Sequence, residues 1–144
     1  MKKRGSKVEY AEARISELMR LYREYTSSCR HISLPDVYSH IVDMPSKRFW
    51  VSGIRAAVVV SAMIRGEDVL SKMRQSKREM FQEIYARVVE IKEKNPSISI
   101  LDICERVVEQ PAPKIYLSAG SAKIMICQYR REKRNHERNR RDNH

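Results

Sequence analysis

Apolar residues recur at steps of three and four along two long stretches of the chain. The two sets are Ile15, Leu18, Met19, Leu21, Tyr22 and Tyr25, and then Met80, Phe81, Ile84, Tyr85, Val88 and Ile91. This spacing predicts two amphipathic helices. Each is preceded by a Ser-x-x-Glu capping box, at 6–9 and at 76–79. The first helix should end near Cys29 and the second near Lys94, because an Asn-Pro pair follows Lys94.

A second pattern appears twice, at 32–52 and again at 98–118, where 6 of 21 positions are identical. A pattern that recurs within one short chain indicates a supersecondary unit that is used twice. Each copy predicts a short helix, capped by Ser33 or Ser99 and ended by Pro45 or Pro111.

An extended connection and a third helix complete each copy of the pattern. Ser52 and Ser118 are the predicted N-caps of these third helices. Gly66 closes the first of them, whereas no glycine or proline follows in the second. The third helix of the second copy is therefore expected to extend into the C-terminal segment.

The order of long helix, short helix, bent connection and third helix resembles the trihelical helix-turn-helix group of DNA-binding modules. The resemblance covers roughly residues 8–66 and 76–130, and it implies that the start of each third helix enters the major groove. The candidate reading residues that it implies are Ser52, Gly53, Arg55, Ser118, Gly120, Ser121 and Lys123. The connection at 45–51 departs from this group, because it is longer and more apolar than the usual tight turn.

The expected fold class is therefore all-α, with two internally repeated trihelical units packed together and basic termini. A linker at 67–75 separates the units. A basic arm at 1–7 precedes them, and a basic tail or helix extension at 131–144 follows them.

The net charge of +11 is concentrated at the two ends of the chain. Residues 1–7 carry four basic groups and no acid, and residues 128–144 carry seven basic and three acidic groups, which leaves 8–127 at +3. A polyanion would therefore contact chiefly the two ends of the chain.

The two third helices differ in polarity. The first, at 54–65, is apolar nearly all round, which is typical of a buried helix. The second places Lys123, Arg130 and Arg134 on one face, with Arg131 beside them. This second helix is the better candidate for contact with a phosphate backbone.

Two cation–aromatic pairs, Arg48 with Trp50 and Lys114 with Tyr116, occupy equivalent positions of the repeat. The aromatic rings could stack on exposed bases, but a residue beside a helix cap also packs back on the first turn. We favour packing for the rings, because the alternation is duplicated beside both caps. For Arg48 and Lys114, contact with a polyanion and simple solvation both stay open.

Other chemistry is weakly indicated. Cys29, His31 and Cys104 are possible metal ligands, but no paired Cys-x-x-Cys motif exists, so no metal and no cofactor are expected. The cysteines are expected to be reduced, mostly buried thiols. No glycine-rich phosphate loop and no nucleophile motif appears, so no enzyme is expected. No apolar run approaches the roughly 18 residues of a membrane span, and the N-terminus does not resemble a secretory signal. The expected location is cytoplasmic.

Two classes of function remain. The first is a small, non-enzymatic nucleic-acid-binding protein, with DNA favoured over RNA because the units resemble groove-binding modules. The alternative is a helical interaction or assembly protein, either a homo-oligomer or bound to a partner protein, in which the basic charge serves solubility or docking.

Overall fold

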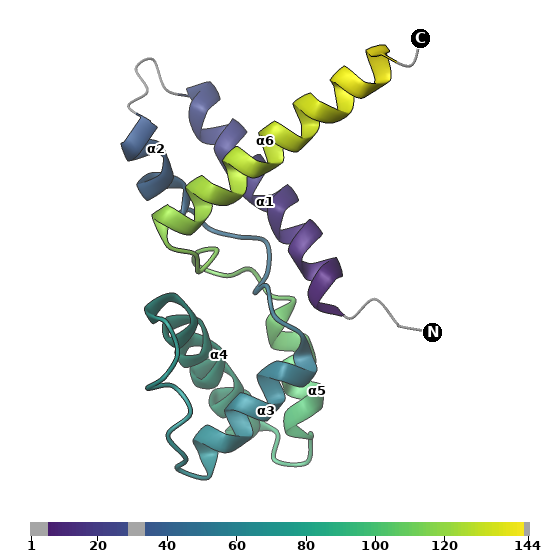
Figure 1. Ribbon diagram of the computed structural model, residues 1–144. Helices are drawn as coiled ribbons and strands as arrows, with labels where there is room; N and C mark the ends of the chain where they lie inside the picture. Colours follow the sequence, from purple (N-terminus) through teal and green to yellow (C-terminus); the bar gives the residue numbers. More distant parts are fainter. Residues whose placement is uncertain (1–5, 29–33, 143–144) are drawn as a thin grey trace.

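The computed structural model of the protein describes residues 6–28 and 34–142, and in these ranges it is all-helical (Figure 1). Its helices are α1 (Ser6–Ser28), α2 (Leu34–Ile41), α3 (Gly53–Ile64), α4 (Gln75–Lys94), α5 (Ile100–Val108) and α6 (Ala119–Asp142). The predicted all-α class is confirmed for these residues. Residues 1–5 of the basic arm, Cys29, His31, the predicted cap Ser33 and the last two residues lie outside them.

Serine caps fix the starts of three helices. The side-chain oxygens of Ser52, Ser99 and Ser118 accept hydrogen bonds from the backbone N–H three residues ahead, at 3.0, 3.1 and 3.1 Å. The predicted capping box at the start of α4 was wrong, because this helix begins before Ser76 and its N-cap, Arg74, has no side-chain cap bond. The carboxylate of Glu79, predicted to complete that capping box, instead accepts from the side chain of Gln75 at 3.2 Å.

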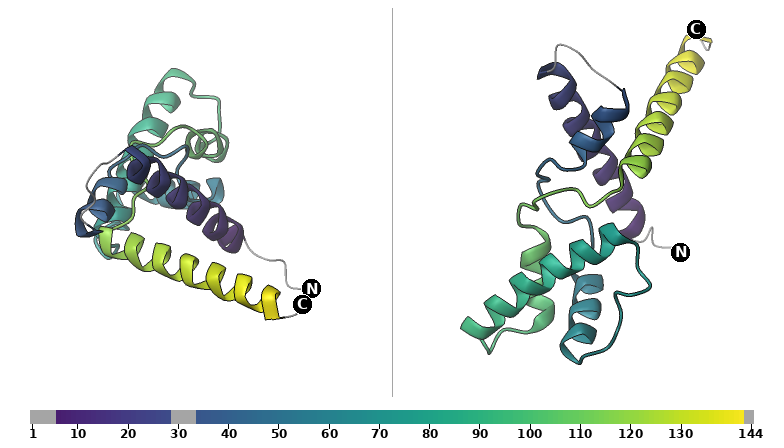
Figure 2. Two further views of the ribbon diagram at one scale, coloured as in Figure 1. Left: turned by 90° about the horizontal axis from the view of Figure 1, so that it is seen from above. Right: turned by 90° about the vertical axis from the view of Figure 1, so that its left-hand side faces the viewer.

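The helices pack in two groups of three, and each group takes its third helix from the other half of the chain. α1 and α2 pack with α6, which we call the α1 group; α4 and α5 pack with α3, which we call the α4 group. In the described residues, α3 packs against neither α1 nor α2. Figures 1 and 2 show the two groups as separate bodies joined by two crossing connections. The ranges 8–66 and 76–130, expected to be the two trihelical units, therefore describe the order of the helices along the chain. They are not the packed groups, because the two ranges exchange their third helices.

The connections at 42–52 and 109–118 run past each other between the groups. Ser46 and Ala112 exchange two backbone hydrogen bonds, and the N–H of Phe49 donates to the carbonyl of Val108 at 2.9 Å. This crossing explains the long apolar connection in the sequence. A tight turn would return the third helix to its own unit, whereas an extended segment carries it to the other group.

Neighbouring side chains of each connection enter different cores. Phe49 packs in the α4 group and Trp50 in the α1 group, while Ile115 packs in the α1 group and Tyr116 in the α4 group. Trp50 and Tyr116 retain only 9% and 8% exposure. Their burial supports packing rather than base stacking. Each ring is nevertheless buried in the group that does not contain the helix after it, so the expected packing on the first turn of that helix was wrong.

A buried carboxylate on α1 holds the first connection. Glu17 is 1% exposed, and its carboxylate accepts from the Lys47 N–H at 2.7 Å, the Arg20 side chain at 2.6 Å and the Ser46 hydroxyl at 3.4 Å. The Trp50 indole in turn donates to the Ser46 hydroxyl at 2.9 Å. Burial opposes the charged form of Glu17, but the bonds and charges of Arg20 and Lys47 outweigh it and keep its pKa below the ordinary value.

Arg87 of α4 holds the second connection with the opposite charge. Its guanidinium donates to the carbonyl of Pro111 at 3.0 Å and to the side-chain oxygen of Gln110 at 3.2 Å. It also lies 4.9 Å from the centre of the Phe49 ring. The two connections are therefore anchored to the long helices by different side chains at different positions.

Candidate nucleic-acid interface

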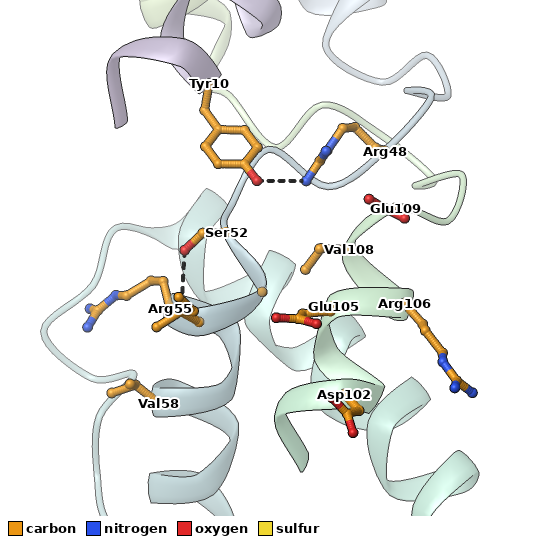
Figure 3. A pocket seen from close by; sticks show the side chains of 12 residues that line it. Tyr10, Arg48, Ser52, Arg55, Val58, Asp102, Glu105, Arg106, Val108 and Glu109 are labelled. Atoms are coloured by element: carbon orange, nitrogen blue, oxygen red, sulfur yellow. Dashed lines mark hydrogen bonds between the residues drawn. The ribbon is translucent and has the colours of Figure 1, made fainter. Parts of the chain in front are cut away.

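Arg48 is occupied by contacts within the protein. Its guanidinium donates to the carbonyls of Phe49 and Val51 at 3.0 and 3.3 Å and to the Tyr10 hydroxyl at 3.4 Å (Figure 3). It also lies over the rings of Tyr10 and Trp50, at 4.8 and 5.5 Å from their centres. Arg48 therefore ties the first turns of α1 to the first connection, and a phosphate would have to compete with these partners.

Lys114, the equivalent cation in the second copy, is half-buried and paired. Its ammonium lies 2.9 Å from the carboxylate of Glu79 and 5.7 Å from the centre of the Tyr116 ring. The hydrogen bond from Lys114 lowers the pKa of Glu79. Lys114 thus joins the second connection to α4, and its charge is already compensated.

The start of α3 faces carboxylates of α5. A Cβ atom added at Gly53 would lie 2.5 Å from Cγ and 2.9 Å from Cα of Glu105, so only glycine permits this approach. Figure 3 shows the Glu105 side chain directed toward the start of α3, beside an open groove of about 840 Å³. Asp102 and Glu109 also line this groove. Arg48, Arg55 and Arg106 line it as well, so the groove carries both charges. Figure 3 shows the Arg55 side chain directed away from Glu105.

The start of α6 differs from that of α3. Ser118 caps it, and the Ser118 hydroxyl also donates to the Ser121 hydroxyl at 2.9 Å. A Cβ atom added at Gly120 would meet no atom within 4 Å. The first turn of α6 is therefore open on the side of Gly120.

One face of α6 carries a row of cations, the basic stripe, consisting of Lys123, Arg130, Arg134, Arg138 and Arg141. Their spacings of seven, four, four and three residues place them on one side of the helix, and all five are exposed. Arg130 donates to the Tyr22 hydroxyl at 3.4 Å and lies 5.9 Å from the centre of its ring. The other four have no hydrogen-bonding or ion-pair partner among the described residues, although acidic side chains stand nearby on the same helix.

Beyond Arg130, the basic stripe stands clear of the rest of the protein. Only the first part of α6 is anchored, through the buried Ala122 and Ile126. Beyond Arg130 every described residue of the helix is exposed, and Figures 1 and 2 show this half projecting away from both groups. Arg138 and Arg141 were not among the predicted site residues, although their spacing continues the row predicted at Lys123, Arg130 and Arg134.

The predicted site residues do not form a single surface. Lys123, Arg130, Arg131 and Arg134 are exposed along α6, with Ser118 and Ser121 at its start. Arg48 and Lys114 lie at the two connections, and Arg55 lies on α3 in the α4 group. The structure therefore separates the α6 residues from the remaining candidates.

The described residues give little indication of a metal site, a reactive thiol at Cys104 or a membrane span. No group of three or more histidine, cysteine or acidic side chains there could hold a metal ion. Cys104 is fully buried in the α4 group. Among the same residues, no helix is both long and apolar enough to cross a bilayer.

Comparison with known proteins gives no further indication. No family model, no curated protein and no solved structure matches the chain.

Proposed function

We propose that this chain is a small, non-enzymatic protein that binds duplex DNA through α6. The observation that supports the proposal is the basic stripe, an exposed row of cations on a projecting helix whose charges are not compensated within the described protein. Such a row favours a polyanion, because each phosphate contact releases condensed counterions.

The shape of α6 favours DNA over RNA. Residues 127–142 form a helical segment roughly 24 Å long, and a helix about 10–12 Å wide fits the major groove of B-form DNA. The major groove of A-form RNA is deep and narrow, so side chains cannot read it. The helix-turn-helix resemblance pointed to both third helices, but the arginines near the start of α3 share their groove with as many carboxylates. On α6, by contrast, no ion pair forms among the described residues. We therefore assign the contact to α6 alone.

The test compares paired charge reversals by fluorescence anisotropy with a labelled random-sequence duplex. Arg134→Glu with Arg138→Glu changes the stripe, and Lys72→Glu with Lys77→Glu is the matched control, because both lysines are exposed outside α6. We expect the stripe variant to lose at least tenfold in affinity while the control stays close to wild type. Equal losses in both variants would indicate diffuse electrostatics and contradict the assignment to α6.

A second candidate function, association with another protein, is favoured by one observation. Ile54 and Val58 are 67% and 55% exposed, and both line the groove beside α5. Exposed apolar side chains at a groove are typical of contact surfaces. This function requires self-association or binding of a partner protein, and Val58→Lys should abolish either. Light scattering of wild type and Val58→Lys over a concentration series measures the self-association.

A further inference from the structure

We propose that α6 also reads base sequence, through a reading face made of Gln128, Arg131 and Asn135. This inference rests on the proposed DNA-binding function and adds to it the recognition of particular bases. Phosphate contacts position a protein on DNA, whereas contacts with base edges give it sequence preference.

The reading face is defined by helical geometry. Steps of three and four residues place Gln128, Arg131 and Asn135 on one side of α6. This side is opposite the buried Ala122 and Ile126, so it points away from the α1 group. All three side chains are exposed, and none has a hydrogen-bonding partner among the described residues.

The chemistry of the reading face matches base edges in the major groove. Asparagine and glutamine amides form paired hydrogen bonds with adenine, and the arginine guanidinium does so with guanine. The basic stripe runs beside this face, with Arg134 and Arg138 nearest to it. A helix that places the reading face toward the bases would therefore carry the stripe along one phosphate strand.

The exposed sides of the other long helices have a different composition. On α1 and α4 several exposed charges pair at four-residue steps, such as Arg20 with Glu24 at 2.8 Å and Lys94 with Glu90 at 3.2 Å. Such pairs support a solvated helix. On α6, Glu137 stands four residues from both Lys133 and Arg141, yet no ion pair forms among its described residues. The α6 surface is thus left available for an external partner.

The experiment selects the preferred duplex from a random library with the full-length wild-type chain. It then measures the ratio of affinities for the selected and random duplexes. Gln128→Ala and Asn135→Ala leave the net charge unchanged, so we expect the salt slope to stay constant while each lowers the ratio by about 5- to 150-fold. Arg134→Gln should weaken binding to both duplexes and reduce the slope by about 0.9, with little change in the ratio. Gln82→Ala, an exposed amide on α4, is the matched control and should change neither quantity.

Two results would overturn the reading face. One is a wild-type chain that binds duplex DNA with a steep salt slope but selects no sequence. The other is a selected sequence whose preference survives Gln128→Ala and Asn135→Ala. In both cases the proposed DNA binding would stand. A wild-type chain that binds no duplex at all would instead refute both proposals.

Discussion

Ser46 and Ala112 exchange two backbone hydrogen bonds, of 3.0 and 2.9 Å, although 66 residues separate them along the chain. These two residues occupy the same position in the two copies of the sequence pattern. The connections that contain them therefore cross at equivalent points, and each carries a third helix into the group formed by the other half. Neither three-helix group is complete without both halves.

This exchange predicts that the halves of the chain fold only together. Fragments 1–70 and 71–144 separate α1 and α2 from α6, and α4 and α5 from α3. Each fragment alone should show reduced helicity by circular dichroism, and mixing them should restore the spectrum and give a 1:1 complex in size-exclusion chromatography. Two fragments that each fold as stable monomers with full helicity would contradict the exchange.

The buried carboxylate of Glu17 should be a strong determinant of stability. Glu17→Ala leaves the Lys47 N–H and the Ser46 hydroxyl without their acceptor, so we expect the free energy of unfolding to fall by about 2–4 kcal/mol in urea denaturation. Glu24→Ala is the matched control, because Glu24 pairs with the same Arg20 but is exposed, and it should cost less than about 1 kcal/mol.

The pH dependence of this contribution follows from the lowered pKa of Glu17. The stabilisation is fully present above the pKa of an unfolded glutamate and is lost as the pH falls through the lower folded pKa. Wild type should therefore lose more stability than Glu17→Gln between neutral and acidic pH. Identical acid denaturation curves for the two proteins would contradict a charged, bonded Glu17.

Gly53 and Gly120 should respond oppositely to alanine. Gly53→Ala places Cβ against the Glu105 backbone, so we expect a loss of about 1–3 kcal/mol in thermal or urea unfolding. Gly120→Ala meets no neighbouring atom, and the lower entropy of its unfolded chain should stabilise α6 by about 0.5–1 kcal/mol. A gain in stability at Gly53 would mean that α3 and α5 are farther apart than the structure shows.

Cys104 and Cys127 should differ sharply in reactivity. Burial raises the pKa of the Cys104 thiol to about 11, whereas Cys127 is exposed on α6. At neutral pH the thiolate of Cys104 is therefore scarce, and reagents cannot reach it. Alkylation followed by peptide mass spectrometry should modify Cys127 in the native protein and Cys104 only in denaturant. Rapid native labelling of Cys104 would contradict its place in the core of the α4 group.

The sequence predicted the helices well, because apolar spacing and serine caps are local signals. Ser52, Ser99 and Ser118 cap the helices that they were expected to cap. Capping at Ser76 failed, because α4 begins at Gln75 and the Glu79 side chain that the capping box requires is bonded to Gln75 and Lys114. That competition involves Lys114, which is distant in the sequence, so the local motif could not reveal it.

The exchange of third helices could not be predicted in the same way. The apolar face of a helix shows that it packs but does not identify its partner, and the extended connection at 45–51 was the one available indication. Arg48 presents the same difficulty, because a cation beside an aromatic residue looks alike whether it meets a phosphate or, as here, the Tyr10 ring.

The salt dependence of duplex binding tests the role of the basic stripe most directly. The comparison is between wild type and a variant with glutamine at Lys123, Arg134, Arg138 and Arg141, leaving Arg130 in its contact with Tyr22. The log-log salt slope should decrease by about 0.9 for each side chain that contacts a phosphate, while the melting temperature stays near that of wild type. A slope equal to that of wild type, in a folded variant, would show that α6 does not contact the DNA backbone.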